Sequence, residues 1–541
     1  MGEQTNDSFQ TESGIPLKKV YGPEDIADLD YVRDLGLSGE APYTRGVYPN
    51  MYRERLWRIF QLSGTGAAED ERERIKYLLA HGETGFIMES DMSSWLSYDV
   101  DHPEVLCRKG DVGFFGAPLN SLRDYEIALE GIPIEKLYCH PSAITPIQSP
   151  FASACYFTLA EKRGIPWSQL SGTGEAGMML QYLGHPSKHL LPPLHAVRLN
   201  CDLIEFCITR LPKWVPLSIE GYNSRETGIN AYQELAMLLA NAIAYIDTLL
   251  SRGRLGIDDF AHAIAGVNFA LGRDFFENIA QVRAARRMWY KLLTERYGAQ
   301  NPRSLRLRIH SLTRGSDWTY EQPLNNIIRG TYHALSAALA GVQSLGVSPY
   351  DEALSTPSEG AHVLSLRTQQ ILQFESNVAS VVDPLAGSYY VEWLTNEMEK
   401  QAWDYLKKIE ERGGYVGVLD SGWAHREAAK GAMDWEKKTA SGEAKVVGVN
   451  CFCMDEEPHV VSPFRPNPKA WEISMARLEQ LRRERDSRKV EPALDELRRV
   501  AESEENVMPA VMNVVKAYGT IGEVGEIWRE SFGTWNVPTL F

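Results

Sequence analysis

Polar side chains stand at the expected ends of several short apolar runs along the chain. Five runs end in these pairs: Glu89 and Asp91, His140 and Ser142, Thr173 and Glu175, Tyr222 and Asn223, and Arg308 and His310. Enzymes built on barrels of parallel strands place their chemistry at the carboxyl ends of the strands. The chain has no HExxH metal motif, nucleophile elbow or P-loop. These residues alone therefore indicate a large barrel enzyme of unknown reaction and do not support a serine or cysteine hydrolase.

Several of the polar residues also have ordinary structural interpretations. Asp91 is as suited to capping backbone amides in a turn as to contacting a substrate. His185 lies in a proline-rich loop and is typical of a surface histidine. Arg283, Arg286 and Arg287 recur on a predicted helix, where we expect them to form ion pairs.

The elements that must position these residues alternate between about residues 50 and 430. Short apolar runs typical of strands occupy residues 85–91, 136–142, 169–173, 217–222, 263–269, 305–312, 343–347 and 379–382. Helical patterns separate them, including residues 69–81, 232–251, 275–297 and 325–340. Eight strand-then-helix units predict an α/β fold, a (β/α)8 TIM barrel with insertions. An open doubly wound sheet is the alternative, because periodicity separates the two arrangements poorly.

The two ends of the chain differ from this alternating pattern. Residues 1–50 are polar and punctuated by proline and glycine, which predicts an extended N-terminal arm that lies on the barrel or contacts a partner subunit. Residues 51–430 are predicted to form the barrel. Residues 431–541 are predicted to form a C-terminal helical extension, and residues 469–503 within it are charge-rich, as in a solvated or partner-facing helix.

Composition narrows the class of protein. The chain has 541 residues, of which 44% are hydrophobic, and a formal net charge of −16. A general nucleic-acid binder needs a basic face, so this charge argues against one. No run of about 18 apolar residues is present, which predicts no membrane span, and the polar N-terminus lacks a signal core, which predicts a cytoplasmic protein. The seven cysteines are dispersed, apart from Cys451 and Cys453, and indicate reduced thiols rather than disulfides or a zinc site.

Longer motifs carry more information than any of these single residues. They occupy residues 42–52, 55–64, 98–103, 110–113, 218–222, 283–286, 343–345, 351–353 and 383–390. In this order, over almost the whole chain, they resemble the methylmalonyl-CoA mutase family. The resemblance implies a (β/α)8 barrel with an acyl-CoA along its axis. It also implies a radical rearrangement of the acyl carbon skeleton that depends on adenosylcobalamin.

Members of this family hold cobalamin in a flavodoxin-like domain whose D-x-H-x-x-G motif supplies the cobalt ligand. This sequence contains no such motif. The resemblance therefore implies that a separate small subunit binds the cobalamin and supplies the cobalt ligand, as in the split isobutyryl- and 2-hydroxyisobutyryl-CoA mutases. The length and the final residues of the chain resemble the large subunit of the latter. The resemblance further implies a heterotetramer and a G-protein chaperone that loads the cofactor.

The site residues of the family can be carried over where the motifs match. The resemblance places Tyr48 and Met51 at the mouth of the active site, and it places Arg55 and Arg308 beside the CoA phosphates. The other carried-over residues line the substrate or CoA (Ser142, Thr173, Tyr222, His310 and Gln343) or the cofactor (Phe115, Glu226 and Glu352).

The sequence departs from the family around the acyl group. Methylmalonyl-CoA mutases have a tyrosine and a carboxylate-binding arginine where this chain has Leu62 and His185. Methylmalonyl-CoA is therefore not the expected substrate. Glu89 stands where the hydroxyisobutyryl enzyme has a hydroxyl-binding aspartate, which predicts a hydrogen bond to a hydroxyl or amino group of the substrate. The alternative is that Glu89 pairs with Arg58 and is structural.

Further departures affect the reaction itself. Asn223 replaces a histidine that hydrogen-bonds the thioester carbonyl, and it can donate a hydrogen bond but cannot serve as a proton donor. Glu175 replaces a glutamine, while Arg58 and Phe60 replace a threonine and an arginine. Together these changes predict a hydroxy-, amino- or aryl-substituted acyl group. Arg58 is the candidate partner for a substrate carboxylate, as in an aryl- or aminoaryl-substituted succinyl or malonyl ester. The residues expected to act in catalysis are Tyr48, Asn223, Glu89 and Arg58.

The leading hypothesis is a carbon-skeleton isomerase that acts together with its small subunit. Asn223 and Ala263, which replaces a family arginine, motivate the alternative of a non-catalytic paralogue that binds acyl-CoA or the small subunit. Retention of Tyr48, Glu226 and Glu352 argues against this alternative, because a non-catalytic protein need not keep contacts to the deoxyadenosyl group. A third hypothesis is an unrelated barrel lyase or isomerase that works without cobalamin.

Overall fold

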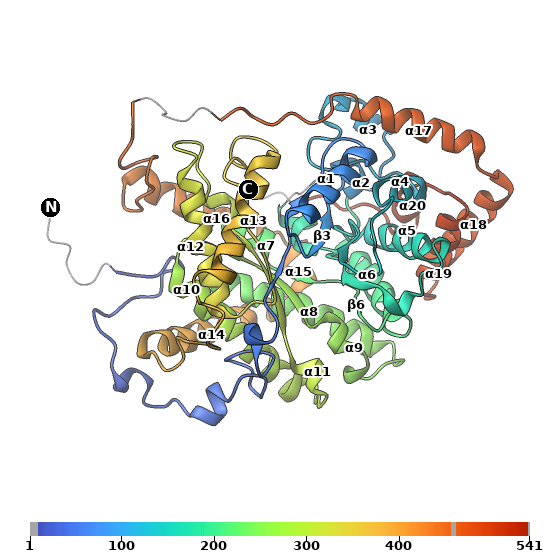
Figure 1. The fold of residues 1–541 in the computed structure, drawn as a ribbon. Helices are drawn as coiled ribbons and strands as arrows, with labels where there is room; N and C mark the ends of the chain where they lie inside the picture. The colour runs from blue at the N-terminus through green and yellow to red at the C-terminus, as the bar shows by residue number, and fades with distance from the viewer. Residues whose placement is uncertain (1–8, 185–186, 188, 456–460, 539–541) are drawn as a thin grey trace.

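The computed structural model describes residues 9–184, 187, 189–455 and 461–538. Within these residues the fold is mixed α/β, with helices packed around short parallel strands (Figure 1). One sheet has the strand order β1 (Arg58–Ile59), β10 (Ser344–Gly346), β9 (Arg308–Thr313), β8 (Gly266–Leu271) and β7 (Ile219–Glu220). The other has the order β2 (Leu62–Ser63), β3 (Gly85–Met88), β4 (Tyr138–His140), β5 (Ser171–Thr173) and β6 (Trp214–Val215).

The two sheets are linked by two segments that pass from one sheet to the other. Only Phe60 and Gln61 separate β1 from β2, and only residues 216–218 separate β6 from β7. Each pair therefore acts as one bent strand shared by both sheets, which leaves eight parallel strand positions in chain order. This order is compatible with a (β/α)8 barrel.

Seven of the eight predicted strands overlap an observed strand, and the prediction for residues 379–382 is wrong. These residues form bends and turns, and Val381 is 61% exposed. Their two adjacent valines suggested a strand, but Asp383, which has a positive φ, and Pro384 follow at once and end any extended run. The eighth observed strand position, which the sequence patterns did not predict, is the β1–β2 segment. Its bend leaves only two residues in each half.

The four predicted helices are confirmed to within a few residues. They are α1 (Ala68–Ala80), α8 (Ala231–Ser251), α10 (Phe275–Lys291, continued by the π-helical turn η7, Leu292–Arg296) and α12 (Asn325–Ala340). A capping box starts α8, because Asn230 and Gln233 each accept the backbone N–H of the other. By length and composition α8 could cross a membrane, but 72% of its apolar window is buried inside the fold. Such burial is typical of a core helix.

The remaining helices cover the strands or extend the fold towards its C-terminus. Those up to residue 305 are α2 (Met92–Trp95), α3 (Pro103–Leu106), α4 (Leu122–Ala128), α5 (Ser149–Lys162), α6 (Pro193–Ile208), α7 (Tyr222–Glu226), α9 (Ile257–Ile264) and α11 (Pro302–Leu305). Those after it are α13 (Glu359–Phe374), α14 (Tyr389–Glu410), α15 (Gly414–Asp420), α16 (Trp423–Ser441), α17 (Ala470–Glu484), α18 (Ser487–Ala501), α19 (Met508–Lys516) and α20 (Ile521–Phe532).

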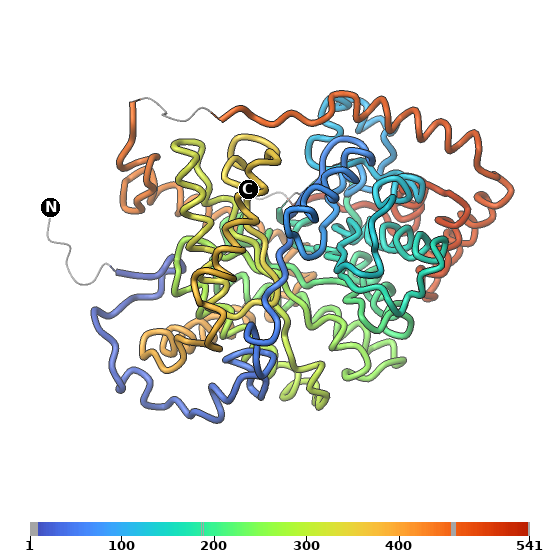
Figure 2. The backbone as a smooth tube through the Cα atoms, in the orientation of Figure 1, coloured from blue at the N-terminus to red at the C-terminus, as the bar shows by residue number. Residues whose placement is uncertain are grey.

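Two clusters of buried apolar side chains hold these helices against the strands. The larger cluster includes Trp289 and joins α8, α10, α12 and α14. The second includes Trp528 and joins α4, α5 and α6 to the C-terminal helices α18, α19 and α20. Figure 2 shows that α17 lies far from α16, on the side of the molecule where α3 is found, and Leu478 of α17 packs against Val105 of α3. The domain boundary predicted at residue 430 falls within α16, and the three-part division stays a prediction.

The N-terminal arm lies on the chain's own helices. Gln10 and Pro16 form an isolated antiparallel bridge, and Tyr21 packs against Tyr390 and Trp393 of α14 with ring centroids 5.0 and 4.7 Å apart. Figure 1 shows the arm passing around the outside of α14. A contact between the arm and a partner subunit stays a prediction.

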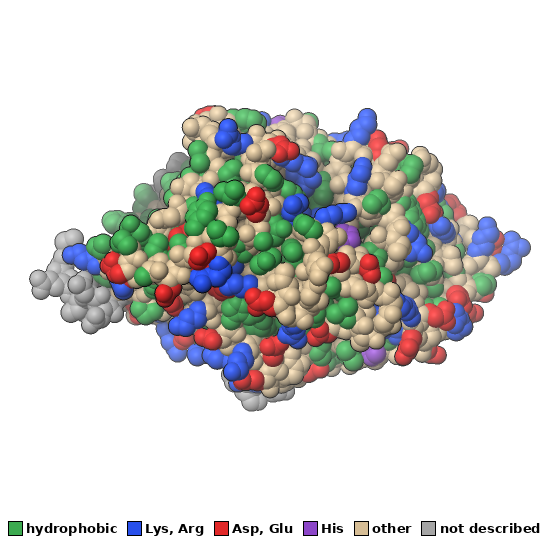
Figure 3. All heavy atoms as spheres, turned by 90° about the horizontal axis from the view of Figure 1, so that it is seen from below, with side chains coloured by type: hydrophobic (Ala, Val, Ile, Leu, Met, Phe, Trp, Pro, Cys, Tyr) green, Lys and Arg blue, Asp and Glu red, His purple; other side chains and the backbone are tan. Residues whose placement is uncertain are grey.

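The face of the molecule seen in Figure 3 mixes acidic and basic side chains. No continuous basic stripe crosses the described residues on that face. The absence of a nucleic-acid ligand stays a prediction from the net charge of −16.

Candidate active site

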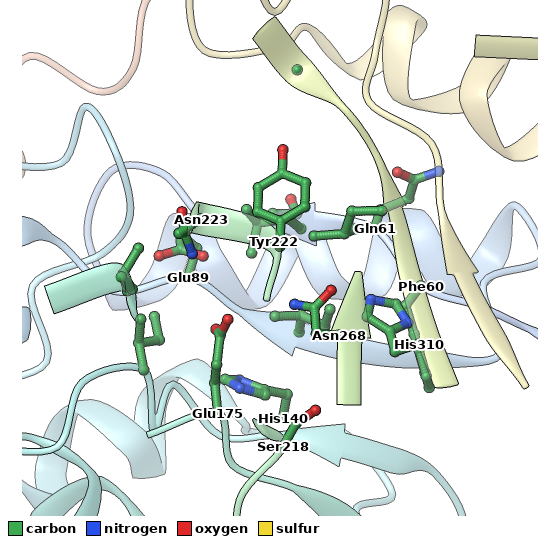
Figure 4. Close-up of a pocket in the computed structure, with 18 of the residues that line it drawn as sticks. Phe60, Gln61, Glu89, His140, Glu175, Ser218, Tyr222, Asn223, Asn268 and His310 are labelled. Carbon is green, nitrogen blue, oxygen red and sulfur yellow. The ribbon is translucent and has the colours of Figure 1, made fainter. Parts of the chain in front are cut away.

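A cavity of about 2250 Å³ opens between the strands and the loops at their ends. Pockets for ordinary small ligands have volumes of about 300–1,000 Å³, so this cavity suits a much longer ligand. Figure 4 shows side chains from both sheets in one close-up of the cavity lining, including those of Phe60, His140 and His310. The predicted site residues that line the cavity are Tyr48, Met51, Arg55, Arg58, Phe60, Leu62, Glu89, Phe115, Thr173, Glu175, Tyr222, Asn223, Glu226, Arg308, His310, Gln343 and Glu352.

Two predicted site residues, Ser142 and His185, are not in this set, and Gln343 is in it but uses its amide on the backbone. Ser142 is fully buried with a φ of 60° and is not part of the cavity lining, because β4 ends at His140 and the chain turns away. His185 lies outside the described residues. Gln343 lines the cavity, but its Oε1 accepts the Ile309 N–H at 2.8 Å and its Nε2 donates to the Gly341 carbonyl at 2.9 Å. Its amide therefore ties strands together instead of facing a ligand with free groups.

Arginines gather at the amino-terminal ends of the strands. Arg58 begins β1 and Arg308 begins β9, where its guanidinium donates to the carbonyls of His262 and Ala265 at 2.7 and 3.2 Å. Burial, followed by the charges of Arg55 and Arg308, lowers the pKa of Arg58. Among the described residues, none of these three arginines forms an ion pair with a carboxylate. The cluster therefore keeps positive charge for an anionic ligand.

The structure rules out the expected alternative that Glu89 pairs with Arg58. Glu89 follows the carboxyl end of β3, next to Gly64, whereas Arg58 begins β1 six residues earlier. At about 3.3 Å per strand residue, a straight strand would separate the two positions by roughly 20 Å, and the bend at Phe60 and Gln61 makes this an upper limit. Arg58 instead lies over the ring of Tyr138, 4.4 Å from its centre. Both side chains line the same cavity, and a contact of Arg58 and Glu89 with one acyl group stays a prediction.

Two neutral histidines stand between the two ends of the cavity. Nδ1 of His310 lies 2.9 Å from Ser344 Oγ, and Phe60 packs between Tyr138 and His310 with ring centroids at 5.4 and 6.1 Å. Burial lowers the pKa of His310 to about 4, and burial together with the charge of His310 lowers that of His140 to about 3. Both imidazoles are therefore uncharged at neutral pH and can serve as hydrogen-bond partners only.

Buried carboxyl groups gather at the carboxyl ends of β3, β5 and β7. Burial raises the pKa of Glu89 well above its usual value, and the charges of Glu175 and Glu71 add to this effect. Burial and the charge of Glu220 raise the pKa of Glu175, whose carboxyl also lies beside the Asn268 amide. The two cavity-lining carboxyls, Glu89 and Glu175, are therefore held largely protonated at neutral pH, which lets them donate hydrogen bonds.

Glu220 fixes the position of Asn223. Its Oε1 accepts the Asn223 backbone N–H at 2.6 Å, and its Oε2 accepts the Leu180 N–H at 2.7 Å. The Asn223 side chain also hydrogen-bonds Glu220. Asn223 therefore enters the cavity from the first turn of α7 in a restrained orientation.

A second pair of carboxyl groups lies at the other edge of the cavity, beside the loop after β9. The Glu226 carboxylate accepts the backbone N–H groups of Gly315 and Ser316 at 2.7 and 2.9 Å. A Cβ atom on Gly315 would lie 3.2 Å from Glu352 Oε1 and 3.4 Å from the Tyr222 hydroxyl, so a glycine keeps this corner open. Burial raises the pKa of Glu352 to about 7, with smaller contributions from neighbouring charges. The corner can accept hydrogen bonds from hydroxyl groups.

Two structural interpretations from the sequence are confirmed. Asp91 accepts the backbone N–H groups of Ser93 and Gly113, both at 2.9 Å, and so caps turns. Arg283 pairs with Asp383 and Glu392, and Arg287 pairs with Glu399. The prediction fails for Arg286, which donates to the carbonyls of Thr44, Ala340 and Gly341 instead of a carboxylate.

The sequence profile described as Methylmalonyl-CoA mutase matches residues 10–534. This chain belongs to the methylmalonyl-CoA mutase family. As a member of that family it is a CoA mutase, an isomerase, and the resemblance carried by its motifs is confirmed.

Relatives of this CoA mutase include both split and longer enzymes. It is 38% identical to the 2-hydroxyisobutanoyl-CoA mutase large subunit of Aquincola tertiaricarbonis over 99% of this chain and 94% of that protein. It is 36% identical to the methylmalonyl-CoA mutase of Cereibacter sphaeroides over 97% of this chain and 73% of that protein. It is 30% identical to the methylmalonyl-CoA mutase large subunit of Streptomyces virginiae over 97% of this chain and 71% of that protein.

Some cavity residues of this CoA mutase were missed by sequence reasoning. Tyr138 and Asn268 line the cavity from predicted strands, and His140 stood among the strand-end residues but was not carried into the predicted site. Asn268 is a polar residue inside an otherwise apolar strand, which is a signal that could have identified it. Glu220 lies within the family motif at residues 218–222, but its role depends on backbone contacts that spacing does not reveal.

Proposed function

We propose that this CoA mutase catalyses an adenosylcobalamin-dependent radical rearrangement, a 1,2-shift of the thioester carbonyl group, on an acyl-CoA other than methylmalonyl-CoA. The acyl group carries a hydroxyl, amino or aryl substituent. The observation that supports this proposal is the order of groups along one cavity. Arginines stand at one end, the raised-pKa carboxyls of Glu89 and Glu175 line the same cavity as Leu62, and Glu226 and Glu352 form a further corner.

The two sheets are proposed to close into one (β/α)8 barrel around the cavity. The shared bent strands β1–β2 and β6–β7 support closure, as do the lining side chains contributed by both sheets. A closed barrel suits radical chemistry, because it keeps water and stray hydrogen donors away from reactive carbon.

The CoA moiety is proposed to bind with its phosphates beside Arg55, Arg58 and Arg308. Guanidinium groups stay charged and present several N–H donors to phosphate oxygens. The chain of the ligand then extends past Phe60 and His310 towards the carboxyl ends of the strands. The role proposed for Arg58 is therefore phosphate binding, in place of the acyl carboxylate contact first expected.

The acyl group is proposed to lie among Leu62, Glu89, Glu175 and Asn223. Leu62 is 48% exposed and gives the site an apolar wall. A protonated carboxyl both donates and accepts a hydrogen bond, so Glu89 and Glu175 suit a hydroxyl or amino substituent. Asn223, held by Glu220, is proposed to donate a hydrogen bond to the thioester carbonyl, while Tyr48 covers the substrate at the mouth.

The corner formed by Glu226, Glu352 and Tyr222 fits the ribose hydroxyls of a deoxyadenosyl group, because its carboxyl oxygens surround an open space at Gly315. When bound, adenosylcobalamin supplies the carbon radical that starts the rearrangement. Phe115, which is 63% exposed, is the proposed apolar contact of the cofactor.

The proposed partners are a small cobalamin-binding subunit that supplies the cobalt ligand and a G-protein chaperone that loads the cofactor, within a heterotetramer. Two relatives are themselves named large subunits, which supports the small subunit. The cytoplasm is the proposed location. All seven cysteines lie in the described residues and are free, which fits a reducing compartment.

A non-catalytic paralogue that binds acyl-CoA or the small subunit is the second candidate. Asn223 favours it, because an amide replaces the histidine of the family. The formed corner at Glu226, Glu352 and Tyr222 favours the catalytic proposal, since binding of acyl-CoA alone does not require it.

The test combines the purified chain with its small subunit, adenosylcobalamin and a panel of acyl-CoA esters, and follows isomerised product by mass spectrometry. The panel contains isobutyryl-, 2- and 3-hydroxyacyl-, pivalyl-, methylmalonyl- and aryl-succinyl-CoA. We expect turnover of a hydroxy-, amino- or aryl-bearing ester, and none when hydroxocobalamin replaces adenosylcobalamin. Preferred turnover of methylmalonyl-CoA would contradict the proposed substrate class. Tight binding of cofactor and acyl-CoA without turnover of any ester would favour the non-catalytic paralogue.

A further inference from the structure

Glu12, on the N-terminal arm, contacts helix α7 and the loop after β9 at the edge of the cavity. Its Oε1 accepts a hydrogen bond from Arg314 Nη1 at 2.7 Å, and its Oε2 lies 3.2 Å from Arg225 Nη2. Arg225 and Arg314 are only 7% and 5% exposed, so these ion pairs are largely shielded from water and salt. One carboxylate therefore joins two segments that are far apart in the sequence.

The two arginines adjoin the residues at the Glu226 corner. Arg225 precedes Glu226 on α7, and Arg314 precedes Gly315 and Ser316, whose N–H groups both donate to the Glu226 carboxylate. Glu12 therefore holds the chain on both sides of these hydrogen bonds. A shift of either arginine would move the Glu226 carboxylate or the amides that orient it.

The segment that carries Glu12 is itself anchored to α10 and α8. The Glu12 N–H donates to Asp274 Oδ2 at 3.0 Å. The N–H and hydroxyl groups of Ser13 donate to the Glu277 carboxylate at 3.0 and 2.8 Å, and Ser13 Oγ accepts the Ala231 N–H at 3.1 Å. Six hydrogen bonds and ion pairs from two adjacent residues make the arm a fixed part of this wall, unlike a mobile surface ion pair.

Each arginine has other acidic neighbours besides Glu12. Arg314 Nη2 lies 2.7 Å from Asp317, and Arg225 lies 3.7 Å from Glu277 and 4.0 Å from Glu234. Removing the Glu12 charge therefore leaves no buried arginine without a carboxylate. A Glu12 variant should lose the alignment of the two segments without leaving an isolated buried charge.

We propose that Glu12 is a positioning residue for the deoxyadenosyl-binding corner, where it aligns Arg225 and Arg314 so that Glu226 faces the ribose hydroxyls. This inference rests on the proposed use of adenosylcobalamin. It assigns the N-terminal arm a role in cofactor binding within its own chain, in addition to any contact with the small subunit.

The experiment measures cobalamin binding by the complex of the full chain with its small subunit. We expect Glu12→Gln to weaken adenosylcobalamin binding by about tenfold, the effect of misplacing one hydrogen bond to a charged group. Binding of hydroxocobalamin, which lacks the deoxyadenosyl group, and the KM for acyl-CoA should stay within about twofold. Glu40→Gln is the matched control, because Glu40 is an exposed acid of the same arm.

A double-mutant comparison separates positioning from general structural damage. If Glu12 acts through Glu226, Glu12→Gln should cause no further loss of adenosylcobalamin affinity in a Glu226→Gln background. Equal losses in both backgrounds, or equal losses for adenosylcobalamin and hydroxocobalamin, would overturn the inference. If Glu12→Gln lowers the Tm so far that cobalamin binding cannot be measured, Glu12→Asp replaces it. The aspartate variant should show a smaller loss of the preference for adenosylcobalamin over hydroxocobalamin.

Measurements on the wild-type complex separate the proposed use of adenosylcobalamin from the proposed role of Glu12. If wild-type complex does not bind adenosylcobalamin more tightly than hydroxocobalamin, the proposed function fails together with the inference. If the wild-type complex shows this selectivity and Glu12→Gln keeps it unchanged, only the role of Glu12 is refuted.

Discussion

The guanidinium of Arg58 lies over the ring of Tyr138, 4.4 Å from the ring centre, at the end of the cavity opposite Glu89. Stacking on an aromatic face stabilises a guanidinium while its edge remains free to donate hydrogen bonds. Phe60 stacks on the same ring at 5.4 Å and so helps to fix the ring on which the arginine lies. Arg58 is therefore a prearranged anion site.

We predict that Arg58→Gln raises the KM for acyl-CoA by about tenfold and leaves kcat within about twofold, because it removes a phosphate contact that is equal in the ground and transition states. Steady-state kinetics at two salt concentrations would check this, since the wild-type KM should rise more with salt than that of the variant. Arg53→Gln, at an exposed arginine outside the cavity, is the control. A change in acyl preference without a change in KM would show that Arg58 contacts the acyl group.

Leu62 should set the size of the acyl group that the site accepts. Leu62→Tyr places a larger, polar side chain in the apolar wall and should lower kcat/KM for an aryl-bearing ester by about 10- to 100-fold, with a smaller effect on isobutyryl-CoA. Competition between two esters in one reaction, followed by mass spectrometry, measures this ratio directly. Leu106→Tyr alters an exposed leucine outside the cavity and should change neither rate. Equal losses for both esters would argue that Leu62 does not face the acyl group.

Asn223 is expected to act on the thioester carbonyl through its side-chain amide. Asn223→Ala should lower kcat by about 10- to 1,000-fold with little change in KM, because the hydrogen bond matters most as charge develops on the carbonyl oxygen. Asn223→Ala and Asn223→His would be compared by single-turnover kinetics. The histidine variant should retain more activity than the alanine variant, because imidazole can donate the same hydrogen bond. An alanine variant with wild-type kcat would exclude this role.

Glu352 should make stability fall as the pH rises through the weakly acidic range. Burial raises its pKa in the folded protein from 4.5 to about 7, so between these values the folded state keeps a proton that the unfolded chain releases. The stability associated with this proton is present below pH 4.5 and is lost as the pH rises to about 7, by up to about 3 kcal/mol. Glu352→Gln removes the titration, so its free energy of unfolding relative to wild type should increase from pH 5 to pH 8.

Urea denaturation at pH 5, 6, 7 and 8 in constant salt would measure this difference. Glu375→Gln, at an exposed glutamate, should show a difference that does not vary with pH. A Glu352→Gln difference that is equally flat would mean that Glu352 is already ionised in the folded protein.

Sequence patterns predicted most of the strands, and most of the predicted site residues line the cavity, because side chains that follow parallel strands converge whatever the exact bounds of the strands. The motifs correctly directed attention to Glu226, Glu352 and Asn223, all of which line the cavity. It was harder to predict which end of a strand, and therefore which end of the cavity, a residue occupies. Arg58 begins β1 and Glu89 follows the end of β3, so the two residues stand towards opposite ends of the strands.

Hydrogen bonds to the backbone were predicted from residue type for Asp91 but not for Gln343 or Arg286. Gln343 uses its amide on Ile309 and Gly341, and Arg286 donates to carbonyls where a carboxylate was expected. The bend at Phe60 hid a strand, because neither half is long enough to show alternation. Only three-dimensional packing determines these arrangements.

The contact between Glu12 and Arg314 also has a consequence for synthesis of the protein. The two residues are 302 positions apart, so the arm cannot dock until most of the chain has left the ribosome. At about 5–20 residues per second, this delay is about 15–60 s. During that time the first segment to emerge has no native binding site. Closure of the cavity edge is therefore a late folding event, coupled to completion of the α7 and β9 loops that the arm holds together.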